Sequence, residues 1–290
     1  MTDSPHKRFL ASELDDIAPE EARFHVIPAP FEASVSYGGG TAAGPDAILD
    51  ASDQLELWDG LSIPAAQGVH THPPVDCTGD AEAVLDRISR ATRSVLDAGG
   101  TPVLLGGEHT VTYGALAALR ERFGRFGVVQ FDAHADLRDS YEGSRWSHAS
   151  VMRRAVSDLG LPLVQYGVRA LCTEEVAFRR EAGVTHWDAA QLARSGVPAR
   201  PLPDGFPESV YVTFDVDGLD PSIMPATGTP VPGGLGWYDA LRLVERSVSG
   251  RRVLGFDVVE LAPIAGWHAA DFAAARLVYD IMGIIQRMAR

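Results

Sequence analysis

Short apolar runs alternate along the chain with longer stretches in which apolar residues recur every three or four positions. The runs predict strands at residues 24–27, 102–105, 127–131, 162–168, 209–214 and 252–258. The longer stretches predict helices at residues 81–98, 111–123, 148–159 and 237–248. Continuous apolar strands that alternate with helices are typical of a parallel sheet covered on both faces. The pattern therefore predicts an α/β fold, in which ligands bind at the carboxyl ends of the strands.

The alternation runs along the chain without a break that would divide it into two domains. Residues 192–207 are rich in proline and glycine, but the stretch is short and we interpret it as a surface connection. We expect a single domain over residues 1–290, in which residues 1–23 form an N-terminal extension that is flexible.

Composition excludes several kinds of partner and several classes of protein. The formal net charge of −14 argues against nucleic acid as the main partner, because phosphate binding needs a basic face, and it leaves room for a small cationic substrate. The two cysteines, Cys77 and Cys172, exclude a disulfide scaffold and suit a reducing compartment. No apolar run has membrane-spanning length and the N-terminus lacks a signal-peptide core, so we expect a cytoplasmic protein without a membrane partner.

Charged side chains follow two of the predicted strands. They are Asp132, His134 and Asp136 after the run 127–131, and Asp215 and Asp217 at the end of the run 209–214. An unpaired buried carboxylate costs several kcal/mol, so such groups at the ends of buried strands indicate a bound cation. Alternate residues of an extended segment share one side, and positions 132, 134 and 136 would do so if the extension continues. The alternative, a solvated loop, fits poorly with the apolar residues that precede Asp132.

His109 lies in a third segment, Gly106-Gly107-Glu108-His109-Thr110, between the strand 102–105 and the helix 111–123. Thr110 or Thr112 is expected to cap that helix. Alone, His109 is explained as well by a hydrogen-bonded turn. With the other clusters it completes a set of two imidazoles and four aspartates, whose charge two divalent cations would neutralise while they activate a water molecule. Oxygen and nitrogen ligands without sulfur favour Mn²⁺, and leave zinc and cobalt open.

Two further side chains are candidates for a catalyst. His148 precedes a predicted helix and is either a proton shuttle or a helix-start residue without a role. Glu260 ends an apolar strand and either pairs with a cationic substrate or forms a structural salt bridge. The segment Gly38-Gly39-Gly40-Thr41 lacks the lysine and the spacing of a P-loop, and we interpret it as a turn before a helix that begins at Gly44.

Several ordered motifs together resemble the ureohydrolase superfamily, which includes arginases and agmatinases. They are PFEASVSYGGGTAAGPDAI (30–48), GGEHT (106–110), FDAHAD (131–136), SHAS (147–150), FDVDGLDPSIMPATGTPVPGGL (214–235) and VVELAP (258–263). The first of them is most like the agmatinases. The resemblance runs from about residue 24 to the C-terminus and implies a three-layer α-β-α domain with a mainly parallel eight-stranded sheet. It also implies a homo-oligomer, a trimer or a hexamer.

The resemblance further implies two Mn²⁺ per chain. One ion would be held by His109, Asp132, Asp136 and Asp215, and the other by Asp132, His134, Asp215 and Asp217. Asp132 and Asp215 would bridge the two ions. By the same resemblance Glu260 would meet the substrate guanidinium, and His148 matches the family's active-site loop histidine, which we expect to relay protons to solvent. Asp136 would pass a proton to the leaving amine, which makes Asp136, His148 and Glu260 the catalytic candidates.

Two positions depart from the arginase pattern and bear on the substrate. Arg138 stands where arginases carry asparagine, and Cys172 stands near the place of an acidic residue that reads the α-amino group of arginine. These changes favour agmatine, hydrolysed to putrescine and urea. Arg138 can also pair with a carboxylate, which keeps a guanidino acid such as 4-guanidinobutanoate open. An arginase, a formiminoglutamase, a single-metal deacetylase and a non-catalytic binding relative are the further alternatives.

Overall fold

A computed structural model describes residues 6–288 and contains one eight-stranded sheet, in which every pair of neighbouring strands is parallel. The strands are β1 (Phe24–Ala29), β2 (Val69–Thr71), β3 (Thr101–Gly106), β4 (Gly127–Phe131), β5 (Leu163–Tyr166), β6 (Thr185–Trp187), β7 (Ser209–Asp215) and β8 (Arg252–Val259). Their order across the sheet is β2-β1-β3-β8-β7-β4-β5-β6. The eight-stranded parallel sheet that the resemblance implied is confirmed.

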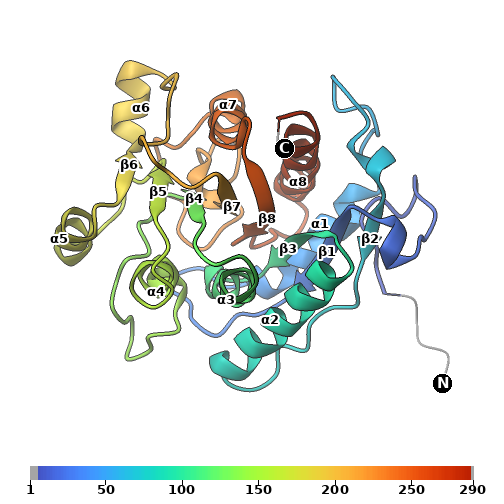
Figure 1. Ribbon diagram of the computed structural model, residues 1–290, viewed down its shortest axis with the longest axis horizontal. Helices are drawn as coiled ribbons and strands as arrows, with labels where there is room; N and C mark the ends of the chain where they lie inside the picture. Colours follow the sequence, from blue (N-terminus) through green and yellow to red (C-terminus); the bar gives the residue numbers. More distant parts are fainter. Residues whose placement is uncertain (1–5, 289–290) are drawn as a thin grey trace.

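Helices cover both faces of the sheet. They are α1 (Gly44–Ser52), α2 (Ala81–Asp97), α3 (Thr112–Phe123), α4 (Val151–Ser157), α5 (Thr173–Ala182), α6 (Ala189–Ser195), α7 (Trp237–Val248) and α8 (His268–Met288). In Figure 1, α2, α3 and α4 lie below the sheet, and α6, α7 and α8 lie above it. The expected three layers are therefore present.

Alternate residues of each strand face the two helical layers. In β1, Phe24 and Val26 belong to one hydrophobic cluster, which includes residues of α1, α7 and α8. Ile27 and Ala29 belong to the second cluster, which includes residues of α2, α3 and α4. Burial on both faces explains why the strands are continuous apolar runs rather than alternating ones.

The described part of the expected N-terminal extension packs on the domain. Phe9 and Leu10 are buried in the first hydrophobic cluster, and the Leu10 backbone N–H donates to the Ser52 hydroxyl of α1 at 2.8 Å. These side chains therefore complete the core, and the flexibility expected of the extension stays a prediction; residues 1–5 lie outside the described part of the chain.

Several predicted elements differ from the observed ones. Strands β2 and β6, of three residues each, and helices α5, α6 and α8 were not predicted, and the predicted helix 148–159 begins with a 3₁₀ turn at His148–Ser150 before α4. The predicted threonine cap of α3 is also wrong. Its N-cap residue is Val111, which has no side-chain acceptor, and Thr112 already lies inside the helix, where its hydroxyl donates to Asp257 at 2.9 Å.

The four strands at the centre of the sheet, β3, β8, β7 and β4, are contiguous and run in one direction. Their carboxyl ends therefore lie side by side at one edge. The segments that follow them carry the residues singled out in the sequence. Within residues 6–288, we find no helix that combines the length and the apolar character needed to span a bilayer.

Candidate metal centre

His109 stands at the centre of the edge where the four strands end. It begins a 3₁₀ turn, His109–Val111, directly after β3. The preceding turn requires glycine at position 107, because any side chain there would collide with the backbone oxygen of Phe31. The imidazole is fully buried, and its Nδ1 lies 3.2 Å from Asp132 Oδ2 and 3.0 Å from Asp136 Oδ2. His109 is therefore grouped with two aspartates from the segment after β4.

A second group lies beside the first. His134 Nδ1 lies 3.0 Å from Asp217 Oδ2 and 3.6 Å from Asp132 Oδ1. In each group the ligand atoms lie within 4.8 Å of one another, so each group could hold a metal ion. Asp132 belongs to both groups, which is the position expected of a bridging carboxylate. Five of the six predicted ligand residues thus fall into two adjacent groups.

The alternation predicted for positions 132, 134 and 136 does not extend to the third residue. Asp136 has a backbone φ of +53°, so the chain turns there and directs its carboxylate to His109 rather than to His134. Asp215 is the fourth aspartate. Its Oδ2 lies 3.6 Å from His109 Nδ1, while its Oδ1 accepts the backbone N–H of Asp217 at 2.8 Å. Asp215 therefore lies next to the first group, but it is not a member of either group, in which all ligand atoms lie within 4.8 Å of one another.

The electrostatics of the site call for added positive charge. The four aspartates are at most 4% exposed, and no lysine or arginine lines the cavity that three of them, Asp136, Asp215 and Asp217, border. Burial, together with the neighbouring Asp132, raises the pKa of Asp136 to about 7, and burial and the neighbouring carboxylates also raise the pKa of Asp215. Burial disfavours the charged form of His134 too, but its hydrogen bonds to Asp132 and Asp217 raise its pKa to about 11.

One atom tests directly whether the residues fit a metal ion. His109 Nδ1 is buried and has no hydrogen-bond partner within the described chain. Its other nitrogen, Nε2, lies 2.8 Å from the Thr213 hydroxyl. A nitrogen with a lone pair facing two carboxylates, and with its opposite N–H engaged, has the arrangement of a metal-ligating histidine. The donor set of imidazole nitrogen and carboxylate oxygen fits a divalent cation of the first transition row.

Glu260 follows β8 and faces the same space. Its Oε1 accepts the backbone N–H of His109 at 2.6 Å, and its own N–H donates to Gly107 at 2.8 Å. Its φ of +67° is in the left-handed region, which a non-glycine residue adopts only where the surroundings enforce it. Such strain concentrates at functional sites, and burial raises the pKa of this carboxyl well above its ordinary value. The salt bridge to arginine that the sequence left open is not formed within residues 6–288.

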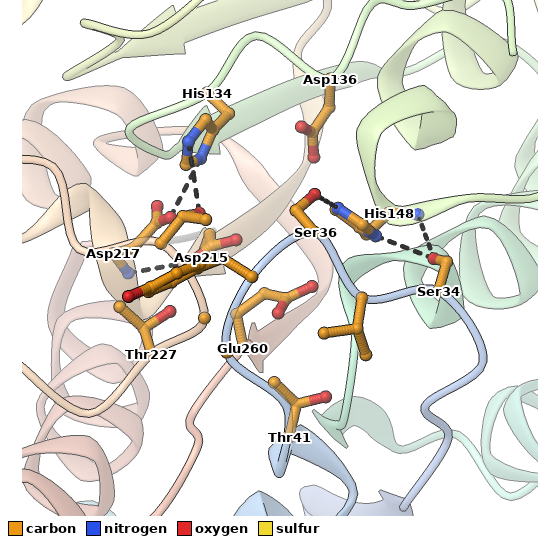
Figure 2. A pocket seen from close by; sticks show the side chains of 15 residues that line it. Ser34, Ser36, Thr41, His134, Asp136, His148, Asp215, Asp217, Thr227 and Glu260 are labelled. Carbon is orange, nitrogen blue, oxygen red and sulfur yellow. Dashed lines mark hydrogen bonds and ion pairs between the residues drawn. The ribbon is translucent and has the colours of Figure 1, made fainter. Parts of the chain in front are cut away.

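His148 lies across the cavity from Glu260, between two serines of the loop that follows β1 (Figure 2). Its Nδ1 lies 2.8 Å from Ser34 Oγ, and its Nε2 lies 2.8 Å from Ser36 Oγ. Burial lowers the pKa of His148 to about 4. The imidazole is therefore neutral at physiological pH, with one nitrogen able to accept a proton.

The site opens through two neighbouring cavities. The inner one, of about 30 Å³, is lined by Asp136, His148, Asp215, Asp217 and Glu260 together with the glycine-rich loop after β1. The outer one, of about 450 Å³, shares His134, Asp136 and His148 with the inner one and is also lined by Arg138, Tyr141 and Cys172. The space beside the aspartates is therefore small, and the larger space lies on the side of Arg138 and Cys172.

Arg138 and Cys172 both border the outer cavity. The Arg138 guanidinium lies over the Tyr141 ring, 5.3 Å from its centroid, and forms no ion pair with the residues that the structure describes. Glu175 also borders the outer cavity, but its carboxylate accepts the backbone N–H groups of Leu137 and Cys172 at 3.0 and 2.7 Å. Its two oxygens therefore stabilise the surrounding loops.

The hydrogen-bond partners of His109 and His148 were not predicted from the sequence. Thr213 donates to Asp257 at 2.6 Å and contacts His109, and Glu108 holds Ser34 beside His148. Asp257 offered a signal, since a carboxylate in the middle of the apolar run 252–258 has to find buried partners. Ser34 offered none, because its partner is more than a hundred residues away in sequence.

Comparisons with known proteins agree with this geometry. Residues 22–283 match the model of the arginase family. The N(1)-aminopropylagmatine ureohydrolase of Thermus thermophilus is 40% identical over 268 residues, which cover 91% of each chain. Its counterpart from Synechocystis is 38% identical and covers 96% of this chain and 93% of the relative. The crystal structure of agmatine ureohydrolase from Thermoplasma volcanium superimposes with a TM-score of 0.85 at 31% identity and covers 99% of this chain and 97% of its own.

Proposed function

The chain belongs to the arginase family, and we propose that it hydrolyses the guanidino group of agmatine, or of agmatine extended by an aminopropyl group, to urea and an amine. Water adds to the guanidinium carbon, the bond from that carbon to the substituted nitrogen breaks, and the amine leaves with a proton. Agmatine would give putrescine. The coarser statement, that the chain is an arginase-family ureohydrolase, follows from the family itself.

The observation that carries the proposal is the charge of the inner cavity. The Glu260 carboxylate lines it and belongs to neither ligand group, Asp136, Asp215 and Asp217 line it as well, and no lysine or arginine does. A guanidinium is a planar cation whose N–H groups match carboxylate oxygens, so it complements this cavity in charge and in hydrogen bonding. The outer cavity then accommodates the alkyl chain.

We propose that two Mn²⁺ ions complete the site. His109, Asp132 and Asp136 would hold one and Asp132, His134 and Asp217 the other, with Asp215 beside the first. When bound, the ions would supply the positive charge that makes water nucleophilic near neutral pH. Glu260 would orient the guanidinium, because its carboxylate is fixed by the His109 backbone. Asp136 would transfer a proton to the leaving amine, and His148 would exchange protons with solvent.

The names of the relatives support an amine-tailed substrate. Two proteins that are 38–40% identical over more than nine-tenths of this chain are named N(1)-aminopropylagmatine ureohydrolase. A structural neighbour is named agmatine ureohydrolase. Both names describe a guanidine whose tail ends in an amine and lacks a carboxylate.

A guanidino acid is the second candidate, and Arg138 is the observation that favours it. The Arg138 guanidinium lines the outer cavity without an ion pair among residues 6–288, and an unpaired arginine in that position can bind a carboxylate. The two candidates therefore differ in the charge at the far end of the substrate.

A urea-release assay on the Mn²⁺-loaded protein tests the proposal. The substrates are agmatine, N1-aminopropylagmatine, L-arginine, 4-guanidinobutanoate and N-formimino-L-glutamate, and formamide is measured beside urea. We expect the highest kcat/KM for an amine-tailed guanidine and no urea from an Asp132→Ala control. If the wild type has its highest kcat/KM for 4-guanidinobutanoate and Arg138→Ala loses that preference, the substrate is a guanidino acid. Formamide release without urea from any guanidine would overturn both.

A further inference from the structure

We propose that Glu108 and Ser34 fix His148 in one tautomer, with its proton on Nδ1 and the lone pair of Nε2 facing the cavity. Glu108 and Ser34 are then positioning residues for the histidine. The effect on turnover rests on the proposed function, but the tautomer itself does not.

The Glu108 carboxylate is the fixed point of this arrangement. It is 1% exposed and lies in the turn between β3 and α3. Its Oε2 accepts the backbone N–H groups of Ala33 and Ser34, each at 2.6 Å. Its Oε1 accepts the hydroxyls of Ser34 at 3.0 Å and Thr110 at 2.5 Å. All four partners are donors, as an ionised carboxylate requires because it can only accept.

The direction of the next hydrogen bond follows from this. A serine hydroxyl has one hydrogen, and that of Ser34 is directed at Glu108. Ser34 Oγ must therefore accept from its remaining partners, which are His148 Nδ1 at 2.8 Å and the His148 backbone N–H at 3.2 Å. Nδ1 consequently carries the proton. Nε2 is left as an acceptor, and the Ser36 hydroxyl at 2.8 Å can donate to it.

The resulting chain is a carboxylate, a hydroxyl and an imidazole in series. A carboxylate that orients a histidine determines which ring nitrogen can take a proton during catalysis. An enzyme whose histidine adopts the wrong tautomer turns over far more slowly. Here the hydroxyl of Ser34 transmits that constraint across the gap between Glu108 and His148. Because Glu108 also adjoins His109 in sequence, one turn after β3 supplies both a candidate metal ligand and the anchor of the histidine opposite it.

The competing explanation is that Glu108 only anchors the loop after β1, and that His148 samples both tautomers. Two serines that flank the same ring separate these explanations. Ser34→Ala removes the acceptor of Nδ1–H, whereas Ser36→Ala removes only a donor to Nε2. The first variant should change the tautomer, and the second should not.

The tautomer is measured by long-range ¹H–¹⁵N correlation of the full-length protein, labelled with ¹⁵N-histidine and loaded with Zn²⁺, which is diamagnetic. A His148→Asn variant assigns the signal. We expect protonated Nδ1 in the wild type, in Ser34→Thr and in Ser36→Ala, and a mixture of tautomers in Ser34→Ala and Glu108→Gln. Protonated Nε2 in the wild type, or an unchanged tautomer in Ser34→Ala, would overturn the proposal.

Kinetics of the Mn²⁺-loaded variants then test the positioning role. General acid–base catalysis contributes roughly 10²–10⁴-fold, so we expect kcat of Ser34→Ala to fall about 10- to 100-fold while KM and metal content stay within about twofold. Ser34→Thr should recover most of the loss. A changed tautomer with unchanged kcat would remove the catalytic role. If no guanidine yields urea from the wild type, the proposed function fails, while the tautomer measurement still decides the assignment of Nδ1.

Discussion

Thr213 contacts His109 from behind: its Oγ1 lies 2.8 Å from His109 Nε2, on the side of the ring opposite Asp132 and Asp136. The Thr213 hydroxyl donates to the buried Asp257 at 2.6 Å, so it must accept from Nε2–H. The lone pair of Nδ1 is thereby left for a metal ion. Outer contacts of this kind orient a ligating histidine and raise its basicity.

We therefore expect Thr213→Val to weaken Mn²⁺ binding about 10- to 100-fold, which is the usual effect of removing such an outer contact. The valine has nearly the same shape, but it leaves Nε2–H without an acceptor. Thr213→Ser keeps the hydroxyl and should bind Mn²⁺ as the wild type does. Isothermal titration of the metal-free proteins measures both affinities, and equal affinities for all three proteins would contradict the assigned role.

The shared position of Asp132 predicts different metal contents for two alanine variants. Asp132 belongs to both groups of ligands, whereas His134 belongs to one. We expect Asp132→Ala to retain less than half of one ion per chain and His134→Ala to retain about one, because a site that loses one of its few ligands no longer competes for the ion. Elemental analysis after desalting gives the stoichiometry. The same metal content in both variants would argue against a bridging role for Asp132.

Glu260 is expected to act on the substrate rather than on the metal ions. Its carboxylate faces the inner cavity and belongs to neither ligand group. Glu260→Gln removes a charge-assisted contact to the guanidinium worth about 2–4 kcal/mol, so kcat/KM should fall roughly 30- to 1,000-fold at unchanged metal content. Steady-state urea release together with elemental analysis checks this. Loss of metal in step with activity would instead place Glu260 among the ligands.

The sequence was informative where function depends on neighbours along the chain. Apolar runs followed by acidic residues located the ends of β4 and β7, and four of the five residues in the candidate metal groups follow these two strands. The short strands β2 and β6 carry too few residues for a periodic pattern. Helix α8 was missed because long stretches of it are buried, so it shows little contrast between an apolar and a polar face.

Contacts between distant segments could not be predicted from the pattern. The pair Ser34 and His148 depends on how the loop after β1 meets the start of α4, and the pair Thr213 and Asp257 depends on the register of β7 against β8. The turn at Asp136 was also unpredictable, because a positive φ at aspartate is imposed by its surroundings and not by the residue type.

Three histidines lie together near the β2 edge of the sheet: His25 on β1, His70 on β2 and His72 directly after β2. His25 of β1 pairs in register with His70 of β2, and His25 Nδ1 lies 3.0 Å from Nε2 of His72. His25 Nε2 and His70 Nδ1 contact the backbone oxygens of Ala22 and Ile17 at 3.1 and 2.8 Å. Burial, and the charge that the other histidines would carry, lowers the pKa of His72 to about 4.

This cluster should make the fold sensitive to acid. Between pH 6.5 and about 4 the unfolded chain binds a proton at His72 and the folded chain does not, so the free energy of unfolding falls as the pH is lowered through this window and is fully retained above it. One fully shifted histidine contributes at most about 1.4 kcal/mol per pH unit, and solvent access to His72 reduces this.

We expect His72→Asn to flatten the pH dependence of thermal stability below pH 6.5. His186→Asn, at an exposed position of β6, is the control and should leave the pH dependence parallel to that of the wild type. Thermal unfolding with a chelator present, so that loss of metal does not contribute, measures all three proteins. Identical slopes for His72→Asn and the wild type would show that the cluster takes up protons as readily when folded as when unfolded.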